Sequence, residues 1–285
     1  MPELPEVETV KRGLAPVLEN AQIKRFALHS PSLRQPLDKS WEQVFTGQTI
    51  TRLSRRGKYL CLHTQTGEGL VIHLGMSGSF RVCGDNTPCI KHDHYSFYLT
   101  SGQAVHYNDP RRFGILRLFS KEQGWQADPA FRKMGPEPLE EGFDASYLKR
   151  VLEEKVTPIK TSLLDQSVVA GLGNIYVCEA LHMAAIHPKR KSGAISLKRL
   201  ERLVASIKEV LARAIEAGGS SLRDHKLTDG SLGYFQHQFL VYGREGEPCP
   251  TCHVLPDGAN SKAQSLIKRA VQSGRSSFYC PRCQS

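Results

Sequence analysis

Hydrophobic residues near the start of the chain recur at intervals of three or four positions. Apolar side chains at this spacing form one face of an α-helix. They are Leu4, Val7, Val10, Leu14, Val17 and Leu18. Pro2 and Pro5 fit the first helical turn, where a missing backbone donor costs little. Gly13 and Pro16 weaken the far end, but the pattern as a whole predicts an N-terminal helix.

From Ile23 to Phe119 the pattern changes to short apolar stretches separated by turn residues such as Gly67-Glu68-Gly69 and Ser101-Gly102. The predicted strands are residues 23–28, 48–55, 58–63, 70–74, 79–82, 94–99, 104–108 and 113–119. Many short strands joined by glycine turns indicate a β-sandwich or a flattened barrel.

A stretch rich in Pro and Gly, residues 134–138, separates these strands from a helical half of the chain. Asp144 and Asn174 are each placed to cap a helix. Apolar residues between positions 197 and 215 predict a long amphipathic helix, which Gly218-Gly219 ends. The final segment is again strand-like and rich in Gly and Cys.

Four of the eight cysteines form two Cys-x-x-Cys pairs, Cys249/Cys252 and Cys280/Cys283. Four thiolates supplied in this way bind one zinc ion tetrahedrally with no open position, so the site is structural rather than catalytic. A redox pair requires only one such motif, and we therefore predict one structural Zn²⁺. The remaining cysteines lack this spacing and are interpreted as structural thiols: Cys61, Cys83, Cys89 and Cys178.

The chain has 285 residues, with 38 Lys+Arg against 28 Asp+Glu and a formal net charge of +10. This length suffices for two domains. The positive excess favours a polyanionic partner, either a nucleic acid or an acidic membrane surface. No apolar run approaches membrane-spanning length, and the N-terminus lacks a basic leader with an apolar core. We therefore expect a cytoplasmic protein that does not enter a membrane.

The first residues carry candidate chemistry. Removal of Met1, which a small second residue permits, would leave Pro2 with a free secondary amine. Such an amine adds to an aldehyde carbon and gives an iminium ion, an electron sink suited to covalent catalysis on a sugar. Glu3 and Glu6 lie beside it as candidate proton donors or acceptors. The alternative is structural, because proline and glutamate are also ordinary residues of a first helical turn.

Basic and apolar residues beside glycines are candidate nucleic-acid contacts. Lys58 follows Arg55-Arg56-Gly57, and Met76 lies between two glycines, which suggests an exposed loop tip. In Asp109-Pro-Arg-Arg-Phe-Gly114, a Phe lies beside arginines. An exposed Phe can fill the space of an extruded base, and an Arg can face the orphaned partner base. The alternative is a turn with Phe113 packed inward.

Together these motifs resemble those of bacterial formamidopyrimidine-DNA glycosylase, over essentially the whole chain. The resemblance is carried by the sequence PELPEVET, by Lys58 and Met76, by DPRRFG and GLGNIY, and by the terminal cysteine pairs. It implies an α+β fold in four parts. They are a β-sandwich with an N-terminal helix (1–120), a linker (121–138), a helix-two-turn-helix domain (139–235) and a zinc-ribbon finger (236–285).

The resemblance also implies a bifunctional DNA glycosylase/AP lyase of base excision repair. Its expected substrates are oxidised purines, namely 8-oxoguanine and formamidopyrimidines, in damaged double-stranded DNA. Excision would proceed through a Schiff base on the N-terminal proline, followed by β,δ-elimination. The expected enzyme is a monomer that acts in the bacterial cytoplasm at the nucleoid and needs no catalytic metal.

Site residues follow from the same resemblance. Pro2 matches the nucleophile that attacks the sugar C1′, Glu3 the acid that protonates the sugar ring oxygen, and Glu6 a supporting carboxylate. Lys58 matches the lysine of β-elimination, and Arg275 matches the helper in δ-elimination. The positions that match DNA contacts are His73, Met76, His92, Arg111, Phe113, Asn174 and Tyr242. Residues 220–234 match the loop that closes over the flipped base.

Two departures from the family pattern stand out. The stretch between Cys252 and Cys280 is longer than the family's usual ribbon loop. A basic DNA contact expected ahead of Thr157-Pro158-Ile159 is replaced by Val156, so we expect Lys160 or Lys155 to take its place.

Two other readings remain open at this point. An endonuclease VIII-like glycosylase would act on oxidised pyrimidines, although Glu-Leu-Pro-Glu after Pro2 and the Arg-Arg-Phe turn favour the purine enzyme. A zinc-ribbon DNA-binding protein would lack catalysis, and the intact Pro2, Glu3 and Lys58 argue against it.

Overall fold

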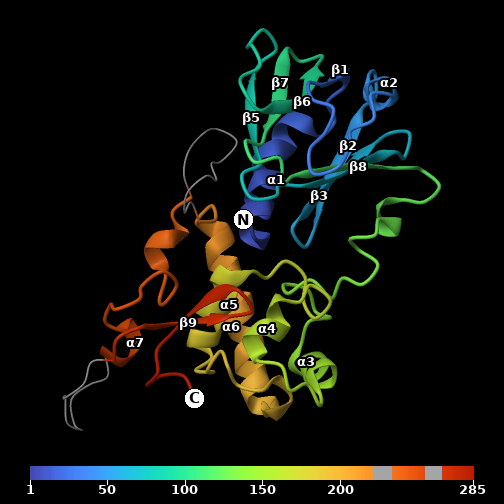
Figure 1. Cartoon of the computed structure of the whole chain (residues 1–285). Coiled ribbons are helices and arrows are strands. Elements are labelled where there is room, and N and C mark those ends of the chain that lie inside the picture. Colours follow the sequence, from blue (N-terminus) through green and yellow to red (C-terminus); the bar gives the residue numbers. More distant parts are fainter. Residues whose placement is uncertain (221–232, 254–264) are drawn as a thin grey trace. The chain divides into compact units, whose positions relative to one another are not determined.

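The computed structural model describes residues 1–220, 233–253 and 265–285. The chain forms two compact units (Figure 1). The first comprises Met1–Lys133 and Ile215–Gln236, and the second comprises Met134–Ala214 and His237–Ser285. None of the described helices has the length and apolar character that a membrane crossing requires.

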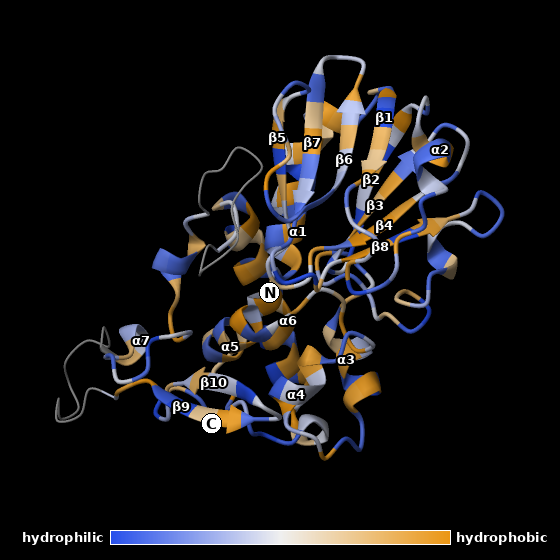
Figure 2. Cartoon of the chain, turned by 45° about the horizontal axis from the view of Figure 1, so that its top comes forward, coloured by the Kyte–Doolittle hydropathy of each residue, from blue (hydrophilic) through white to orange (hydrophobic). Residues whose placement is uncertain are grey.

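Two four-stranded antiparallel sheets form the first unit. One has the order β1-β6-β7-β5 and the other β2-β3-β4-β8. The strands are β1 (Ile23–Leu28), β2 (Ile50–Arg56), β3 (Tyr59–Thr64), β4 (Gly69–His73), β5 (Ser79–Gly84), β6 (Asp93–Leu99), β7 (Gln103–Asn108) and β8 (Ile115–Phe119). Each lies where the apolar pattern predicts a strand, and Figure 2 shows hydrophobic residues in the strands of both sheets. β6 and β7 are buried along most of their length.

The core of this unit collects apolar residues from both sheets and from helix α1 (Leu4–Leu18). Val7, Val10 and Leu14 of α1 are buried in it, which confirms the predicted N-terminal helix. The helix continues through Pro16 to Leu18 because burial of its apolar face outweighs the weak residues at its end. A five-residue helix, α2 (Trp41–Phe45), is not predicted from the sequence, since so short a segment has no periodicity to detect.

Residues 121–133 pack against the second sheet, although the family resemblance implies a linker over residues 121–138. Arg117 of β8 forms a bidentate ion pair with Asp128, in which both N···O distances are 2.6 Å. Phe131 contacts the ring of Tyr59 edge-on, with centroids 5.4 Å apart. The segment includes a short 3₁₀ turn, η1 (Trp125–Ala127), and belongs to the first unit up to Lys133.

The second unit contains helices and a small hairpin. Its helices are α3 (Ala145–Leu152), α4 (Ile159–Leu164), α5 (Asn174–Met183), α6 (Leu197–Glu216) and α7 (Pro250–His253), and short 3₁₀ turns lie at η2 (Ser192–Ala194) and η3 (Phe235–Gln238). The last residues of α6 and the first of η3 group with the first unit.

Asp144 caps α3 as predicted, accepting from the Tyr147 amide at 2.6 Å. Asn174 does not cap α5, because Gly173 takes the cap position and Asn174 is the first helical residue.

The C-terminal hairpin pairs β9 (Lys268–Gln272) with β10 (Arg275–Tyr279). Ser273 and Gly274 form its two-residue turn with φ of 47° and 73°. Left-handed conformation at both positions matches the twist of the strands. The turn places the exposed Arg275 at the start of β10.

Candidate active site and nucleic-acid interface

The start of α1 is fixed by the carboxylate of Glu6. Its Oε2 accepts from the Glu3 amide at 2.8 Å, and its Oε1 accepts from the amide and hydroxyl of Ser220 at 2.8 and 3.0 Å. Pro2, Glu3 and Glu6 are all buried. A carboxylate committed to these donors holds the backbone beside Pro2 in place, and it links that backbone to a segment 214 positions away.

Glycines allow the segment after α6 to approach Glu6. Gly219 has φ of +77°, and a Cβ added there would lie 3.1 Å from Oε1 of Glu6. Gly233 packs against it so closely that an added Cβ would lie 2.4 Å from the Gly219 carbonyl oxygen. Ser220 and Tyr234 form an isolated antiparallel bridge. Both ends of the predicted base-closing loop are therefore held together, while residues 221–232 of that loop lie outside the described residues.

Lys58 lies in the tight turn between β2 and β3. Gly57, with φ of +55°, makes this turn possible. The Arg55 guanidinium holds the turn, because its Nη1 donates to the Gly57 carbonyl at 3.0 Å and its Nε donates to Glu8 of α1 at 3.0 Å. Burial raises the pKa of Glu8, but hydrogen bonds from Lys11 and Arg55 outweigh burial and leave it lowered. The Lys58 turn is thus tied to the same helix that carries Pro2 and Glu3.

His73 lies at the end of β4, next to Lys58. Its Nδ1 accepts from the Gly75 amide at 3.0 Å, and its ring packs on Tyr59 with centroids 4.7 Å apart. Burial, together with the positive charge of Lys58, lowers the pKa of His73 to about 4. A neutral imidazole here can donate through Nε2 to an acceptor, while its Nδ1 fixes the loop that follows.

The buried carboxylate of Asp109 joins two loops. It accepts from the Ser77 hydroxyl at 2.5 Å and from the Gly114 amide at 2.8 Å. Gly75 lies so close that an added Cβ would be 2.5 Å from the Phe113 carbonyl carbon. The loop after β4 and the loop after β7 are consequently one rigid platform rather than two independent tips.

The side chains on this platform point outward. Met76 is 37% exposed and Phe113 is 46% exposed, whereas Leu74 beside them is buried. The Arg111 guanidinium carbon lies 5.0 Å from the centroid of the Phe113 ring. Phe113 is therefore not packed into the core, and the predicted exposed loop tip at Met76 is confirmed. His92, with φ of 75°, is adjacent, since its carbonyl accepts from the Asp109 amide at 3.0 Å.

In the second unit, Glu179 of α5 anchors the segment that leads into the cysteine pairs. Its carboxylate accepts from the successive amides of Leu240, Val241 and Tyr242 at 2.7, 3.0 and 2.8 Å. Burial raises the pKa of Glu179, although these amides lower it in part. Tyr242 packs its ring edge-on against Phe278 of β10, with centroids 5.1 Å apart. The hydrogen bonds to Glu179 and this ring contact together fix Tyr242 relative to the hairpin.

The four cysteines of the two Cys-x-x-Cys pairs come together in space. The Sγ atoms of Cys249 and Cys283 are 3.8 Å apart, and those of Cys252 and Cys280 are 3.9 Å apart. Four thiolates at Zn–S distances of about 2.3 Å in a tetrahedron place their sulfurs about 3.8 Å apart. The site therefore has the shape that a tetrahedral zinc ion requires.

Comparisons with known proteins agree along the whole chain. Residues 1–116 match the model of the formamidopyrimidine-DNA glycosylase N-terminal domain, residues 134–226 its H2TH domain, and residues 265–285 a zinc finger found in FPG and IleRS. The formamidopyrimidine-DNA glycosylases of Rhodopseudomonas palustris (strain TIE-1) and Caulobacter vibrioides (strain NA1000 / CB15N) are 49% and 48% identical to this chain. In each case 100% of both chains is covered.

The chain belongs to the formamidopyrimidine-DNA glycosylase family. It is a DNA glycosylase of base excision repair with the AP lyase activity that is characteristic of this family, and its cofactor is one structural zinc ion.

Solved structures of this family show the same fold. A complex between the Lactococcus lactis Fpg and DNA containing an abasic site matches with a TM-score of 0.86 and 36% identity over 99% of both chains. A complex of the wild-type L. lactis Fpg with DNA containing N7-benzyl-Fapy-dG matches with a TM-score of 0.86 and 36% identity over 100% of both chains. The expected α+β fold, with an N-terminal sandwich, an H2TH domain and a zinc finger, is confirmed.

One predicted DNA contact of this glycosylase needs correction. Lys160 is 0% exposed, and its ammonium donates to the Ser276 carbonyl at 2.8 Å and to the Ser277 hydroxyl at 2.7 Å. A buried lysine that binds β10 is not available to a phosphate at the surface. Lys155 is only partly buried and remains the candidate for the position where Val156 replaces a basic residue.

Asn174 also binds strand β10. Its Nδ2 donates to the same Ser276 carbonyl at 2.9 Å, while its Oδ1 is buried without a partner among the described residues. Ser276 directly follows Arg275, so Lys160 and Asn174 together set the position of the strand that carries Arg275. In this unit a residue predicted to touch DNA thus holds another predicted contact in place.

Several residues organise the site in ways that were not predicted from the sequence: Glu8, Arg55, Asp109, Glu179 and Ser220. Asp109 could have been predicted to have a structural role, because an acidic residue within a basic turn indicates a charged or hydrogen-bonded partner nearby. Glu179 accepts from backbone amides, which every residue has, so no sequence pattern could have pointed to its partners.

Proposed function

We propose that this glycosylase removes oxidised purines from duplex DNA, with the amine of Pro2 as nucleophile once Met1 is removed. The observation that carries the proposal is the arrangement around α1. Glu6 fixes the backbone next to Pro2, and Arg55 and Glu8 tie the Lys58 turn to the same helix. A nucleophile, a carboxylic acid and an ammonium group on one rigid support suit Schiff-base chemistry on a sugar.

The steps follow from the chemistry of these groups. The Pro2 nitrogen forms a bond to C1′ and loses its proton, and the base leaves with the electron pair of the glycosidic bond and takes up a proton. Glu3 gives a proton to the ring oxygen as the bond from C1′ to that oxygen opens, which produces the iminium ion. A proton then leaves C2′ and the 3′ phosphate departs, and we assign the handling of this proton to Lys58. Arg275 assists the second elimination, in which the 5′ phosphate departs.

The platform formed by the loops after β4 and β7 is assigned to the duplex itself. Phe113 and Met76 offer exposed apolar groups to fill the space of the flipped base, and Arg111 offers donors to the orphaned base opposite. Because Asp109 fixes these loops, the insertion of Phe113 costs little reorganisation. His73 and His92 are assigned to the DNA backbone on either side of the platform.

In the second unit, Asn174, Tyr242 and Arg275 are assigned to the DNA backbone. Two of the similar solved structures hold DNA that contains an abasic site or a modified formamidopyrimidine. Damaged double-stranded DNA is therefore the proposed partner, and the protein acts on it as a monomer at the bacterial nucleoid.

Borohydride trapping on a duplex with 8-oxoguanine opposite cytosine tests the proposal. A protein that begins at Pro2 should form a covalent adduct at that residue, and Pro2→Gly or a retained N-terminal tag should reduce or abolish it. An adduct only with oxidised pyrimidines would instead assign the chain to an endonuclease VIII-like specificity. Binding without an adduct on either duplex would indicate a noncatalytic DNA-binding protein.

A further inference from the structure

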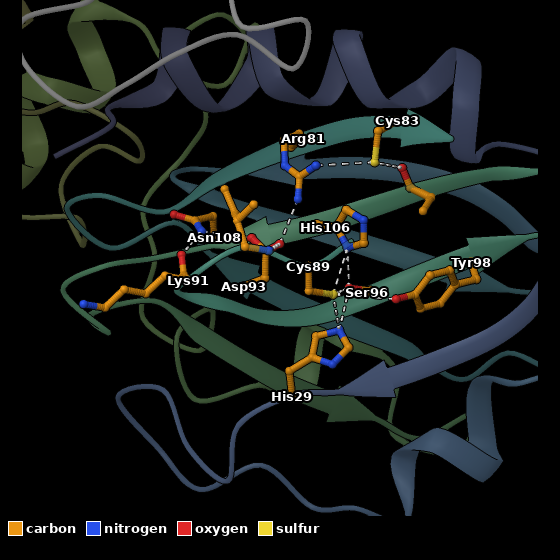
Figure 3. A network of polar contacts seen from close by, with 12 residues as sticks. His29, Arg81, Cys83, Cys89, Lys91, Asp93, Ser96, Tyr98, His106 and Asn108 are labelled. Atoms are coloured by element: carbon orange, nitrogen blue, oxygen red, sulfur yellow. Dashed lines mark hydrogen bonds and ion pairs between the residues drawn. The ribbon is translucent and has the colours of Figure 1, made fainter. Parts of the chain in front are cut away.

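The outer face of the β1-β6-β7-β5 sheet carries side chains that the glycosylase reaction does not use. Along β6, Phe97 is buried in the core, so its neighbours Ser96 and Tyr98 face the other side. On β7, His106 pairs with Ser96 in the sheet register and lies on the same side. Figure 3 shows these residues gathered around the thiol of Cys89, from the connection between β5 and β6.

His29, just after β1, completes the cluster. Its backbone amide donates to the His94 carbonyl at 2.8 Å, which extends the pairing of β1 with β6 and directs the imidazole across the sheet. Its Nε2 lies 2.7 Å from the Ser96 hydroxyl, and Nδ1 of His106 lies 2.6 Å from the same oxygen. One serine thus spaces two imidazoles that are far apart in the sequence.

The two sulfur–nitrogen distances in this cluster are close to those around a bound metal ion. The Sγ of Cys89 is 3.4 Å from Nε2 of His29 and 3.8 Å from Nδ1 of His106, and all these atoms lie within 4.8 Å of one another. Around a tetrahedral zinc ion, a thiolate sulfur and an imidazole nitrogen are separated by about 3.6 Å. The two observed distances lie on either side of this value.

The zinc ribbon provides an internal standard for this comparison. There the sulfur separations of 3.8 and 3.9 Å agree with the tetrahedral value to about 0.1 Å. His29, Cys89 and His106 come within about 0.2 Å of the corresponding sulfur–nitrogen value. They and the four ribbon cysteines are the two groups of potential metal ligands with this proximity among the residues that the structure describes.

Neighbouring contacts hold the thiol in position. The carboxylate of Asp93 accepts from the Ile90 amide at 2.9 Å, from Arg81 at 2.8 Å and from Asn108 at 2.9 Å. Ile90 directly follows Cys89, so the loop is fixed one residue away from the thiol. Ligands that are already held in place lose little conformational freedom when a metal binds.

We infer that His29, Cys89 and His106 form a second metal site on this glycosylase, which binds Zn²⁺ with a solvent molecule as fourth ligand. One thiolate and two imidazoles suit a borderline-soft cation rather than Mg²⁺ or Ca²⁺. Binding replaces the thiol proton of Cys89 by the metal and releases that proton to solvent, so no oxidant or reductant takes part. His29 and Cys89 are exposed, which gives the ion an entry path, while His106 is buried beneath them.

This assignment revises the interpretation of Cys89 as a structural thiol. The side chain is exposed, and its sulfur contacts nitrogen and oxygen atoms: His29, Ser96, Tyr98 and His106. Cys83, on β5 of the same sheet, contacts Arg81 and the Ala104 carbonyl instead. It therefore serves as a matched control.

Zinc stoichiometry after equilibrium dialysis, measured by elemental analysis, tests the site. The wild type should bind one zinc ion more than Cys89→Ser and one more than His29→Gln, since all three keep the ribbon zinc. Cys83→Ser should bind as much as the wild type. Equal stoichiometry in the wild type and Cys89→Ser would overturn the proposal, and so would binding of Cu⁺ but not Zn²⁺ at the cluster.

Alkylation of the thiols gives an independent readout on the unaltered protein. Saturating Zn²⁺ should slow the reaction of Cys89 with iodoacetamide by at least about tenfold, because the thiolate is the reactive form and the metal occupies it. The rate at Cys83, followed by mass spectrometry in the same sample, should not change. Equal rates at Cys89 with and without zinc would exclude a metal at this thiol.

Discussion

Glu6 and Glu179 are both buried carboxylates that accept hydrogen bonds from a distant segment, but the donors differ. Glu6 binds the Glu3 amide, close by in sequence, together with the amide and hydroxyl of Ser220. Glu179 binds three successive backbone amides, from Leu240 to Tyr242. The first joins a proposed nucleophile to the end of a long helix, and the second joins a helix to the start of the zinc ribbon. One buried acid therefore holds the backbone beside the proposed nucleophile, and the other holds the second unit together.

Replacing Glu6 with Gln should have the largest effect on activity. The side-chain amide cannot accept from Glu3 and Ser220 at both of its ends, so the backbone beside Pro2 shifts. A misplacement of about 1 Å at a reacting group costs about 100-fold in rate. We therefore expect single-turnover strand cleavage to fall by about 100-fold, with the zinc content unchanged. Glu141→Gln, at an exposed position, should cleave like the wild type. An unchanged rate in Glu6→Gln would show that Glu6 does not position the nucleophile.

Replacing Glu179 with Ala should affect stability. It leaves three amides in or near the interior without their acceptor, and a buried group that loses its partner costs about 1–3 kcal/mol. We expect the free energy of unfolding, measured in urea, to fall by about 3 kcal/mol or more. The exposed Glu201→Ala on α6 should change it by less than about 0.5 kcal/mol. Similar unfolding free energies for the two variants would show that the hydrogen bonds from Leu240, Val241 and Tyr242 to Glu179 do not stabilise the fold.

The pH dependence of stability should distinguish Glu179 further. Because burial raises its pKa in the folded state above the ordinary value of 4.5, the folded protein binds more protons than the unfolded chain between these values. This contribution to stability is complete below pH 4.5 and is lost as the pH rises through the raised pKa. Glu179→Gln removes it. The unfolding free energy of the wild type should therefore fall relative to that of Glu179→Gln as the pH rises. A difference between the two that stays constant with pH would count against the raised pKa.

The smallest effect concerns His73, beside Lys58 in the first unit. Its pKa is lowered from the ordinary 6.5 to about 4, so the folded protein keeps this imidazole neutral where the unfolded chain protonates it. The resulting stabilisation is present above pH 6.5 and is lost as the pH falls toward 4. An NMR titration of the His73 ring protons should give a midpoint of about 4 in the folded protein and about 6.5 in urea. A folded-state midpoint near 6.5 would show that burial and the charge of Lys58 do not lower the pKa of His73.

Local patterns predicted much of the fold. Strand β1 occupies the predicted residues 23–28, and Asp144 caps its helix, because alternation and capping depend only on neighbours along the chain. The predictions that were wrong concern tertiary packing. Residues 121–133 pack against a sheet because Arg117 meets Asp128, and Lys160 turns inward because β10 offers it acceptors. A lysine in a sequence shows its charge, but its direction depends on which acceptors the fold brings close.

The sequence by itself determined the features that depend on residue type and short spacing. They are the proline next to two acids, the strands of the sandwich, the Arg-Arg-Phe turn and the two cysteine pairs. Only the tertiary structure decided which way Phe113 points, which segments Glu6 and Glu179 hold, and that His29 meets Cys89 and His106. Hydrogen bonds and coordination act over about 2–4 Å, and 214 positions separate Glu6 from Ser220, so folding alone creates these contacts.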